Sequence, residues 1–584
     1  MGLKTSLLVR YSFAATFLIS NLAAAPRLRL STAAVGPVSV ATGASGTAPS
    51  VDAYNAGDGE LNPTASGSAA WLAPVVAAGR SCGSGAGTCY AIQIGLVTAS
   101  LSAGMYTGTI TVSDPNALDA PQTITVTVQV GGGVPNQVEV WIPPDQSSRD
   151  VTFTTNTLLT TRVSTESGVN WLSVTTEGSG SFRFTYPYHV RVTHQADMAE
   201  GSYAGSFVTG GSSLSPENRT VPVTMRVTSQ PIAKASAERV SVRLAQGAAK
   251  QVRRIALAND GMGSLEAGQA DAATDNGVAW LSALPTEGTA IPFVIDPAGL
   301  DPGAYKGNLT LNSNAANSPL NVRVELQVVP TGAPVAAYGS LKDMATPGAP
   351  VLLAPGGMAT LAGEQLTMGD PIADTPPPYP TSLGGLRVLV NGQAAALSAV
   401  FYDQTVFQVP FGTAAGGAEV RVERDGLTGN GLAADMADRA PRIYGAGSGQ
   451  YGKVYNSDGT LAMPPNPAFD GSRPARVGEN IVIWATGLGA TDPAVNTGDA
   501  APEDPPANVT GTTLVTFGGG FSGGSATVAP VSAILAPGLV GIYQVTVTVP
   551  GETPLGSAVP VAISVDYALS NAVRIAIDPA PSAQ

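Results

Sequence analysis

A Trp-Leu pair followed by a Gly-x-Tyr-x-Gly segment occurs three times in this chain, and it constrains the fold more than any other feature. The pairs begin at Trp71, Trp171 and Trp280, so successive copies stand about 100 residues apart. That spacing is the size of one immunoglobulin-like sandwich and is longer than most solenoid repeats. The sequence therefore predicts a tandem array of sandwich domains.

The strand that opens at each repeated Tyr alternates apolar and polar side chains. From Tyr106 to Val112, apolar residues fall on one face and Thr residues on the other. This period of two is typical of half-buried antiparallel strands, and it predicts an all-β protein without long helices after residue 25. The aromatic rings are predicted to pack in the sandwich cores, because such rings bury large apolar areas. An alternative for the Trp residues is a sugar-stacking platform. The predicted core residues are Trp71, Tyr106, Trp171, Tyr203, Trp280 and Tyr305.

Short Pro-containing linkers follow the copies, at 131–135, 228–231 and 330–334. Because proline stiffens a linker, these segments predict a semi-rigid string of sandwiches. Since separate cores unfold separately, each sandwich is expected to unfold on its own. Pro222 stands at an outward position of the closing strand of the second copy. This position predicts an edge strand, where a missing N–H costs little.

An Asn-x-Gly turn precedes the Trp-Leu pair in two copies, at Asn55–Gly57 and Asn259–Gly261, whereas the second copy lacks it. Together with the Gly-x-Tyr-x-Gly strand, this pattern resembles the BACON family of bacterial immunoglobulin-like domains. The resemblance implies a sandwich fold and binding of carbohydrate or mucin, often beside enzymes or in surface proteins.

The pattern changes near residue 333. Leu386–Val390 reads as a strand that runs into Asn391-Gly392, the strongest short signal for a hairpin. Phe407–Pro410 has a related copy near Tyr543, which predicts two related sandwiches. These segments resemble the C-terminal region of uncharacterised secreted acidobacterial proteins, which is similar to IPT/TIG folds. The resemblance implies an exported, all-β, non-catalytic module. It rests on residues 380–385, 407–410, 473–479, 485–489, 536–545 and 569–571.

The first 25 residues match a secretory signal peptide. Lys4 and Arg10 precede a mostly apolar run, and small residues end it at Ala25. A membrane anchor is the alternative, but the apolar run is shorter than the ~20 residues that a spanning helix needs. No second segment of the chain predicts a transmembrane span. In an exported protein, Cys82 and Cys89 are expected to form one disulfide that closes a short loop.

The charge of the chain argues against nucleic acid as a partner. The net charge is -13 and only 12% of the residues are charged. A phosphate backbone needs a basic stripe that releases counterions, and the sequence has none.

Two short motifs match catalytic patterns without their structural setting. Gly520–Gly524 reads G-x-S-x-G, but a nucleophile elbow needs a following helix and a later His. Gly447–Gly452 reads G-x-G-x-x-G, yet it leads into a hairpin pattern instead of a helix N-terminus. His189 and His194 are predicted to lie on opposite faces of a strand, which disfavours a shared metal. The acidic loop Asp492–Asp504 reads as a solvated loop, with a Ca²⁺ site as the alternative.

No catalytic, cofactor or metal residue is therefore predicted. The first function hypothesis is a secreted or cell-surface structural and adhesive scaffold, whose partner is a glycan or another extracellular protein. The second is a carbohydrate-binding protein, and the third is an unrecognised hydrolase. The predicted segments are a signal peptide at 1–25, immunoglobulin-like repeats at 26–132, 133–230 and 231–332, an IPT/TIG-like sandwich at 333–445 and a second C-terminal sandwich at 446–584.

Overall fold

The structure is a computed structural model of the whole chain. It describes residues 26, 28–55, 60–82, 88–117, 120–166, 169–177, 186–196, 198–337, 339–346, 352–446, 450–466, 469, 471–519 and 524–579. The predicted signal peptide lies outside the described residues.

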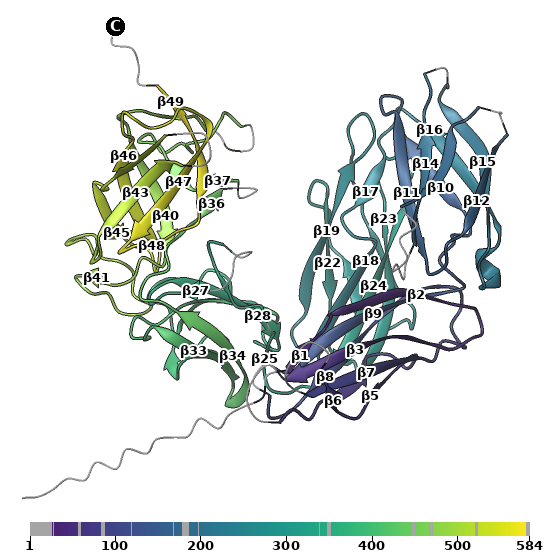
Figure 1. The fold of residues 1–584 in the computed structure, drawn as a ribbon, viewed down its shortest axis with the longest axis horizontal. Helices are drawn as coiled ribbons and strands as arrows, with labels where there is room; N and C mark the ends of the chain where they lie inside the picture. The colour runs from purple at the N-terminus through teal and green to yellow at the C-terminus, as the bar shows by residue number, and fades with distance from the viewer. Residues whose placement is uncertain are drawn as a thin grey trace, which may run out of the picture.

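The described residues form ten β-sheets, and these enclose five separate clusters of buried apolar side chains. The one helix among them is the single-turn 3-10 helix η1 (Ser215–Glu217). This arrangement confirms the predicted all-β tandem array of immunoglobulin-like sandwiches, which Figure 1 shows as five successive bodies.

In the first sandwich, sheet β1-β3-β7-β5 packs against sheet β2-β9-β8-β4, and β6 pairs with β7. Its strands are β1 (Leu28–Leu30), β2 (Ala34–Val40), β3 (Gly46–Asn55), β4 (Thr64–Gly67), β5 (Leu72–Val76), β6 (Arg80–Ser81), β7 (Thr88–Leu96), β8 (Gly104–Ser113) and β9 (Gln122–Val130).

In the second sandwich, sheet β10-β16-β15-β12 faces sheet β11-β14-β13. Its strands are β10 (Val138–Ile142), β11 (Ser148–Thr155), β12 (Thr160–Thr165), β13 (Leu172–Thr176), β14 (Tyr186–Thr193), β15 (Gly201–Gly210) and β16 (Thr220–Val227).

In the third sandwich, sheet β17-β19-β22-β21 faces sheet β18-β24-β23-β20. Its strands are β17 (Ala233–Ala235), β18 (Arg239–Ala245), β19 (Gln251–Asn259), β20 (Asp271–Thr274), β21 (Leu281–Ala283), β22 (Ala290–Ile295), β23 (Gly303–Leu311) and β24 (Leu320–Val329).

In the fourth sandwich, sheet β25-β28-β32-β31 faces sheet β27-β34-β33-β29-β30, and β26 pairs with β28. The predicted Asn391-Gly392 turn joins β29 to β30, and both residues have positive φ angles (48° and 77°). Its strands are β25 (Val335–Ala336), β26 (Lys342–Asp343), β27 (Leu352–Leu353), β28 (Met358–Glu364), β29 (Leu386–Val390), β30 (Gln393–Ala394), β31 (Ala396–Val400), β32 (Gln404–Gln408), β33 (Gly416–Arg424) and β34 (Leu427–Met436).

The fifth sandwich has the two largest sheets, with β35 and β41 at the ends of one and β36 and β44 at the ends of the other. Because β35 pairs with β40, this sandwich begins near Arg442, and the predicted boundary at 445/446 is a few residues late. Its strands are β35 (Arg442–Ile443), β36 (Gly445–Ala446), β37 (Tyr451–Gly452), β38 (Val454–Tyr455), β39 (Ala475–Arg476), β40 (Asn480–Thr486), β41 (Thr491–Asp492), β42 (Asn508–Val509), β43 (Thr513–Gly518), β44 (Ser525–Val528), β45 (Ser532–Leu535), β46 (Tyr543–Thr548), β47 (Gly556–Val565), β48 (Ala568–Leu569) and β49 (Val573–Asp578).

The prediction of an edge strand at Pro222 is wrong. Strand β16 lies between β10 and β15 in its sheet. Pairing with β10 begins only at Val223, so Pro222 sits just beyond the end of the neighbouring strand. The missing N–H therefore leaves that ladder intact, although the strand is internal.

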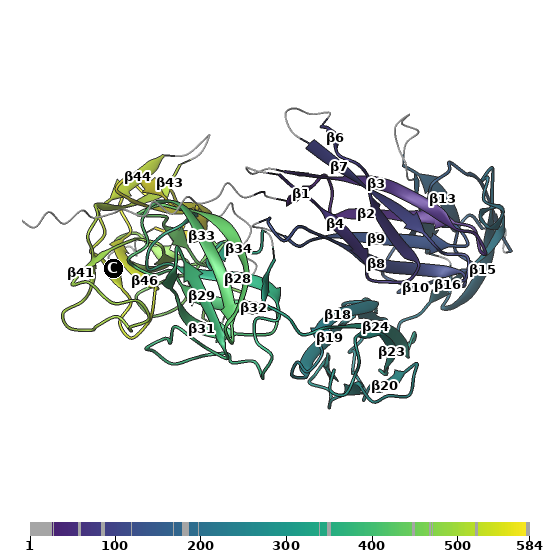
Figure 2. The ribbon, with the colours of Figure 1, turned by 90° about the horizontal axis from the view of Figure 1, so that it is seen from below.

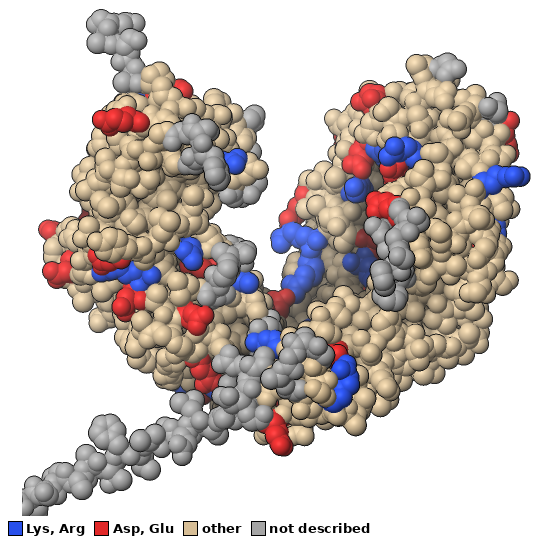
Figure 3. All heavy atoms as spheres, in the orientation of Figure 1, with Lys and Arg blue, Asp and Glu red and all other residues tan. Residues whose placement is uncertain are grey.

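The sandwiches do not follow one another in a straight line. Figure 2 shows the third sandwich beside the first, with β18 and β24 near β8, so the chain doubles back after the second sandwich. In Figure 3 the first three sandwiches form one arm of the molecule, the last two form the other, and a notch separates the arms.

The third and fourth sandwiches share buried contacts. Tyr402, 2% exposed, belongs to the apolar cluster of the third sandwich, although it follows β31 of the fourth. Its hydroxyl accepts a hydrogen bond from the Ala245 backbone N–H at 2.7 Å. At the rim of this contact, Arg243 pairs with Glu364 at 2.9 Å.

The fourth and fifth sandwiches are joined by buried hydrogen bonds. Gln408 accepts from the Gly498 N–H at 2.7 Å and donates to the Gly356 carbonyl at 3.1 Å. The Thr486 hydroxyl accepts from the Met358 N–H at 3.0 Å. Buried amides and hydroxyls are costly unless paired, so these bonds favour one fixed orientation.

Candidate functional site

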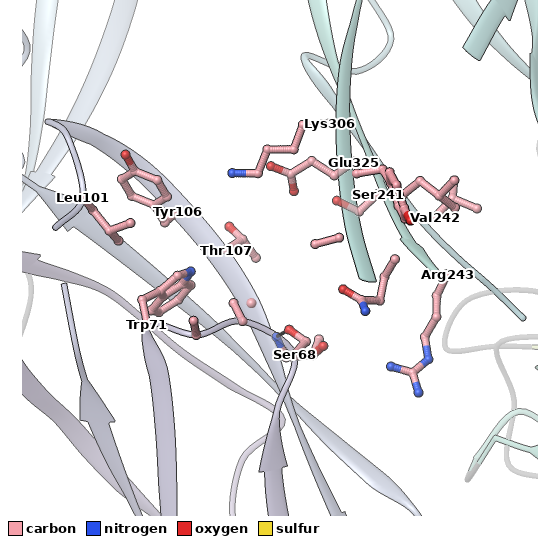
Figure 4. Close-up of a pocket in the computed structure, with 18 residues that line it drawn as sticks. Ser68, Trp71, Leu101, Tyr106, Thr107, Ser241, Val242, Arg243, Lys306 and Glu325 are labelled. Carbon is pink, nitrogen blue, oxygen red and sulfur yellow. Dashed lines mark hydrogen bonds between the residues drawn. The ribbon is translucent and has the colours of Figure 1, made fainter. Parts of the chain in front are cut away.

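A cavity of about 420 Å³ lies between the first and third sandwiches. One wall comes from the turn before β5 and from β8, and the other comes from the outer face of the sheet that contains β18, β23 and β24 (Figure 4). Clefts of this size between domains are common places for small ligands.

Trp71 shapes the wall of the first sandwich. It lies within a tight turn closed by the Leu72 N–H, which donates to the Ala69 carbonyl, and the Trp71 carbonyl accepts from the Val97 N–H. A Cβ placed on Gly108 would lie only 3.1 Å from Cζ2 of Trp71, so the glycine provides the space for the indole ring. Trp71 is 8% exposed and lines the cavity.

Tyr106 forms the rest of this aromatic wall. Its ring packs against the core of the first sandwich and stays half-buried. The hydroxyl donates to the Ser102 carbonyl at 2.9 Å. Tyr203 and Tyr305 are also half-buried and repeat this bond to the carbonyl four residues earlier, at 2.8 and 2.9 Å. The phenol hydroxyl thus keeps each ring at the core edge.

The wall of the third sandwich is polar because strand residues alternate between its two faces. Val242 and Leu326 belong to the core side of their strands. Their neighbours Ser241 and Glu325, together with Lys306 on β23, point outward toward the cavity (Figure 4). Lys306 and Glu325 are direct partners in the antiparallel register of β23 and β24.

Lys306 is the cation that faces the aromatic wall. Its Nζ lies 5.9 Å from the centroid of the Tyr106 ring, within the range of a cation–π contact. Glu325 is held instead by Arg239, with Nη1 and Oε1 3.3 Å apart. Arg239 also donates to the Met105 carbonyl of the first sandwich at 3.2 Å. Within the described part of the chain, no carboxylate lies within ion-pair distance of Lys306.

The second and third repeated Trp residues lie outside the cavity. Trp171 and Trp280 are 1% and 2% exposed, and their indole N–H groups are buried without a hydrogen-bond partner. Of the three repeated Trp residues, Trp71 is the one that lines this cavity. Tyr305 also lines it, from β23. The repeat pattern therefore contains residues of both walls, including Tyr305 and its neighbour Lys306, but it does not indicate that the two walls face each other.

Cys82 and Cys89 form a disulfide that links the end of β6 to β7. Neither residue belongs to the cavity wall.

The remaining candidates do not converge on one site. His189 interacts with Glu177 at 3.2 Å, while His194 contacts the Met198 carbonyl at 3.0 Å. Residues 520–523 of the G-x-S-x-G motif and 447–449 of the glycine-rich motif lie outside the described residues. Around the latter, β36 and β37 pair as an antiparallel hairpin. Across the described ranges, no three His, Cys, Asp or Glu side chains are placed to share a metal ion, the Asp492–Asp504 loop included.

In the part of the chain that the structure describes, no helix has the length and apolar character required to cross a membrane.

No family model matches the chain, and no curated protein matches it. Among solved structures it is similar to protocadherin gamma B2 extracellular cadherin domains 1–5, at 10% identity over 89% of this chain and 94% of that chain, with a TM-score of 0.15. The human desmocollin-1 ectodomain matches at 9% identity over 71% and 80%, with a TM-score of 0.15. An endo-fucoidan hydrolase of glycoside hydrolase family 107 matches at 14% identity over 47% of this chain, with a TM-score of 0.14, and the chain spans 39% of that protein. These likenesses concern the fold alone.

Proposed function

We propose that this chain is an exported, non-catalytic scaffold that holds an adhesive surface in a fixed arrangement outside the cytoplasm. The observation that carries the proposal is the set of buried contacts between sandwiches. A passive tether needs only exposed linkers, whereas this chain places Tyr402 of one sandwich in the core of another. Such contacts keep distant surfaces at a constant separation and angle.

Export is part of the same proposal. It rests on the signal-peptide pattern of the first 25 residues and on the single Cys pair, which is bonded. Disulfides persist in oxidising compartments outside the cytoplasm. The composition, with few charged residues and many hydroxyl groups, suits a partner that is a glycan or another extracellular protein.

Carbohydrate binding is the second candidate function, and the cavity between the first and third sandwiches favours it. Trp71 and Tyr106 supply apolar ring surface, while Thr107, Thr109 and Ser241 supply hydroxyl groups. A sugar ring presents both an apolar face and hydroxyl groups, so this wall chemistry suits it.

The test measures both adhesion of the chain to extracellular material and its hydrolytic activity. Beads coated with the mature chain are expected to adhere to extracellular material of the source cells, and the chain is expected not to hydrolyse chromogenic esters, glycosides or peptides. Beads coated with a denatured chain are the control. Hydrolysis that scales with protein concentration and disappears on one point substitution would overturn the non-catalytic assignment, and equal adhesion by the control would overturn the adhesive one.

A further inference from the structure

We infer that the cavity between the first and third sandwiches binds an acidic sugar, meaning a hydroxylated ring that carries a carboxylate or a sulfate. The inference rests on the carbohydrate-binding candidate above and adds a charge requirement and named residues. Trp71 and Tyr106 would contact the ring, and Lys306 would contact the anionic group.

The charge requirement follows from the ion pairs around the cavity. Glu325 is the one acidic residue of the wall, and Arg239 already neutralises it. Arg243, at the other end of the wall, is paired with Glu364 of the fourth sandwich. Asp275, the other carboxylate that interacts electrostatically with Lys306, is paired with Arg323. The Lys306 ammonium therefore remains as a local positive charge in a chain whose net charge is -13. An anion placed there gains a charge-assisted hydrogen bond.

The ring requirement follows from the position of the ammonium. Lys306 reaches across the gap toward the face of Tyr106, so an anionic group that contacts it also lies close to the aromatic wall (Figure 4). Ser68, Thr107 and Ser241 line the same space and offer hydroxyl donors and acceptors. A simple inorganic anion could use the ammonium and the hydroxyl donors, but it would leave the ring surface of Trp71 and Tyr106 unused.

Among the three repeated Trp residues, only Trp71 lies where the first sandwich faces the third, so the site involves the Trp of the first repeat alone. Trp171 occupies the equivalent repeat position but is sealed in the core of the second sandwich and lies outside this cavity. Trp71→Phe and Trp171→Phe therefore make a matched pair, since both shorten a buried ring but only the first alters the cavity wall.

The test is isothermal titration of the mature chain with three probes: an oligogalacturonate, a sulfated dextran oligosaccharide and the unsulfated dextran oligosaccharide. We expect at least one acidic probe to bind at least tenfold more tightly than dextran, with affinity that falls as salt rises. Comparison of the two acidic probes shows whether the site prefers a carboxylate or a sulfate. Lys306→Met is expected to weaken that binding about tenfold, whereas Lys234→Met, an exposed lysine on β17, is expected to leave it unchanged.

Trp71→Phe is expected to weaken binding of the same probe several-fold, and Trp171→Phe is expected to have no effect. Equal binding of dextran and the acidic probes would overturn the charge requirement while leaving carbohydrate binding in place. If the Lys306→Met variant binds the acidic probe as tightly as the parent does, the ligand lies elsewhere. If none of the three probes binds, the proposed site is wrong. The rigidity of the scaffold is measured separately, by X-ray scattering. A failure of the scaffold proposal can therefore be told apart from a failure of the sugar site.

Discussion

At the scale of single residues, the repeated motif is explained by contacts between an indole ring and a glycine. Cβ atoms placed on Gly205 and Gly307 would lie 3.0 and 3.3 Å from Cζ2 of Trp171 and Trp280. The sequence predicted that these rings pack inside, and they are buried. The Tyr rings pack at the edges of the cores, and the alternation of residues does not indicate that a backbone carbonyl four residues earlier accepts each hydroxyl.

Gly307→Ala tests this explanation. The new methyl group would meet the Ala273 carbonyl at 2.7 Å and Leu281 Cδ2 at 2.9 Å, so we expect a loss of about 1–3 kcal/mol in unfolding free energy. Gly303→Ala is the matched control on the same strand, because its nearest neighbours are 3.8 Å away or more. Chemical denaturation of both variants provides the comparison. Equal stability of the two would show that the close packing around residue 307 does not require a glycine.

At the scale of elements, one loop of the fifth sandwich is held by an ion-pair network. Arg473 contacts Asp458 and Glu479, each at 2.7 Å. Glu479 also accepts hydrogen bonds from the Ser457 hydroxyl and the Arg476 N–H. The Arg473 hydrogen bond, more than any other cause, lowers the pKa of Glu479 to about 2.

This lowered pKa predicts acid sensitivity. A carboxylate with a depressed folded-state pKa stabilises the fold above its ordinary pKa and loses that contribution as pH falls toward the folded value. We therefore expect the unfolding free energy to drop by about 1.5–3 kcal/mol between pH 4.5 and pH 2 through this group. Glu479→Gln should flatten the pH dependence in that window, which denaturation at several pH values measures. An unchanged slope would contradict the assignment.

The disulfide is a second element-scale feature. It spans a sequence separation of only 7 residues, and a short loop restricts the unfolded chain little. We expect reduction to cost less than about 3 kcal/mol and to leave the first sandwich folded. Alkylation of the unfolded, non-reduced chain should find no free thiol at Cys82 or Cys89. Circular dichroism before and after reduction reports the fold, and its loss on reduction would contradict the expectation.

At the scale of the whole molecule, the sandwiches were predictable and their docking was not. Strand alternation and the repeat spacing reflect local burial, so they indicate each sandwich without reference to the others. The hydrogen bond from Ala245 to Tyr402 joins residues 157 positions apart in different sandwiches. In the sequence, no feature distinguishes Tyr402 from other aromatic residues at the ends of strands. The repeated motif contains Tyr305 and Lys306 of the third-sandwich wall, but nothing in it indicates that this wall faces the first sandwich.

Shared burial predicts shared unfolding of the third and fourth sandwiches. Trp280→Ala should destabilise the third sandwich by about 3–5 kcal/mol through lost burial and a residual cavity. Because Tyr402 packs in the same cluster, we expect the calorimetric transition of the fourth sandwich to shift with it. Trp171→Ala is the control, because its cost should stay in the second sandwich. If Trp280→Ala leaves the transition temperature of the fourth sandwich unchanged, the junction contributes little to the stability of that sandwich.

Small-angle X-ray scattering of the mature chain reports whether the five sandwiches hold one arrangement in solution. We expect a scattering curve that the two-armed shape of Figure 3 reproduces, unchanged between low and moderate salt. Tyr402→Ala, which empties the buried position at the junction of the third and fourth sandwiches, should broaden the distribution of distances between the arms. A parent curve typical of an extended, flexible string, indistinguishable from that of Tyr402→Ala, would contradict the account.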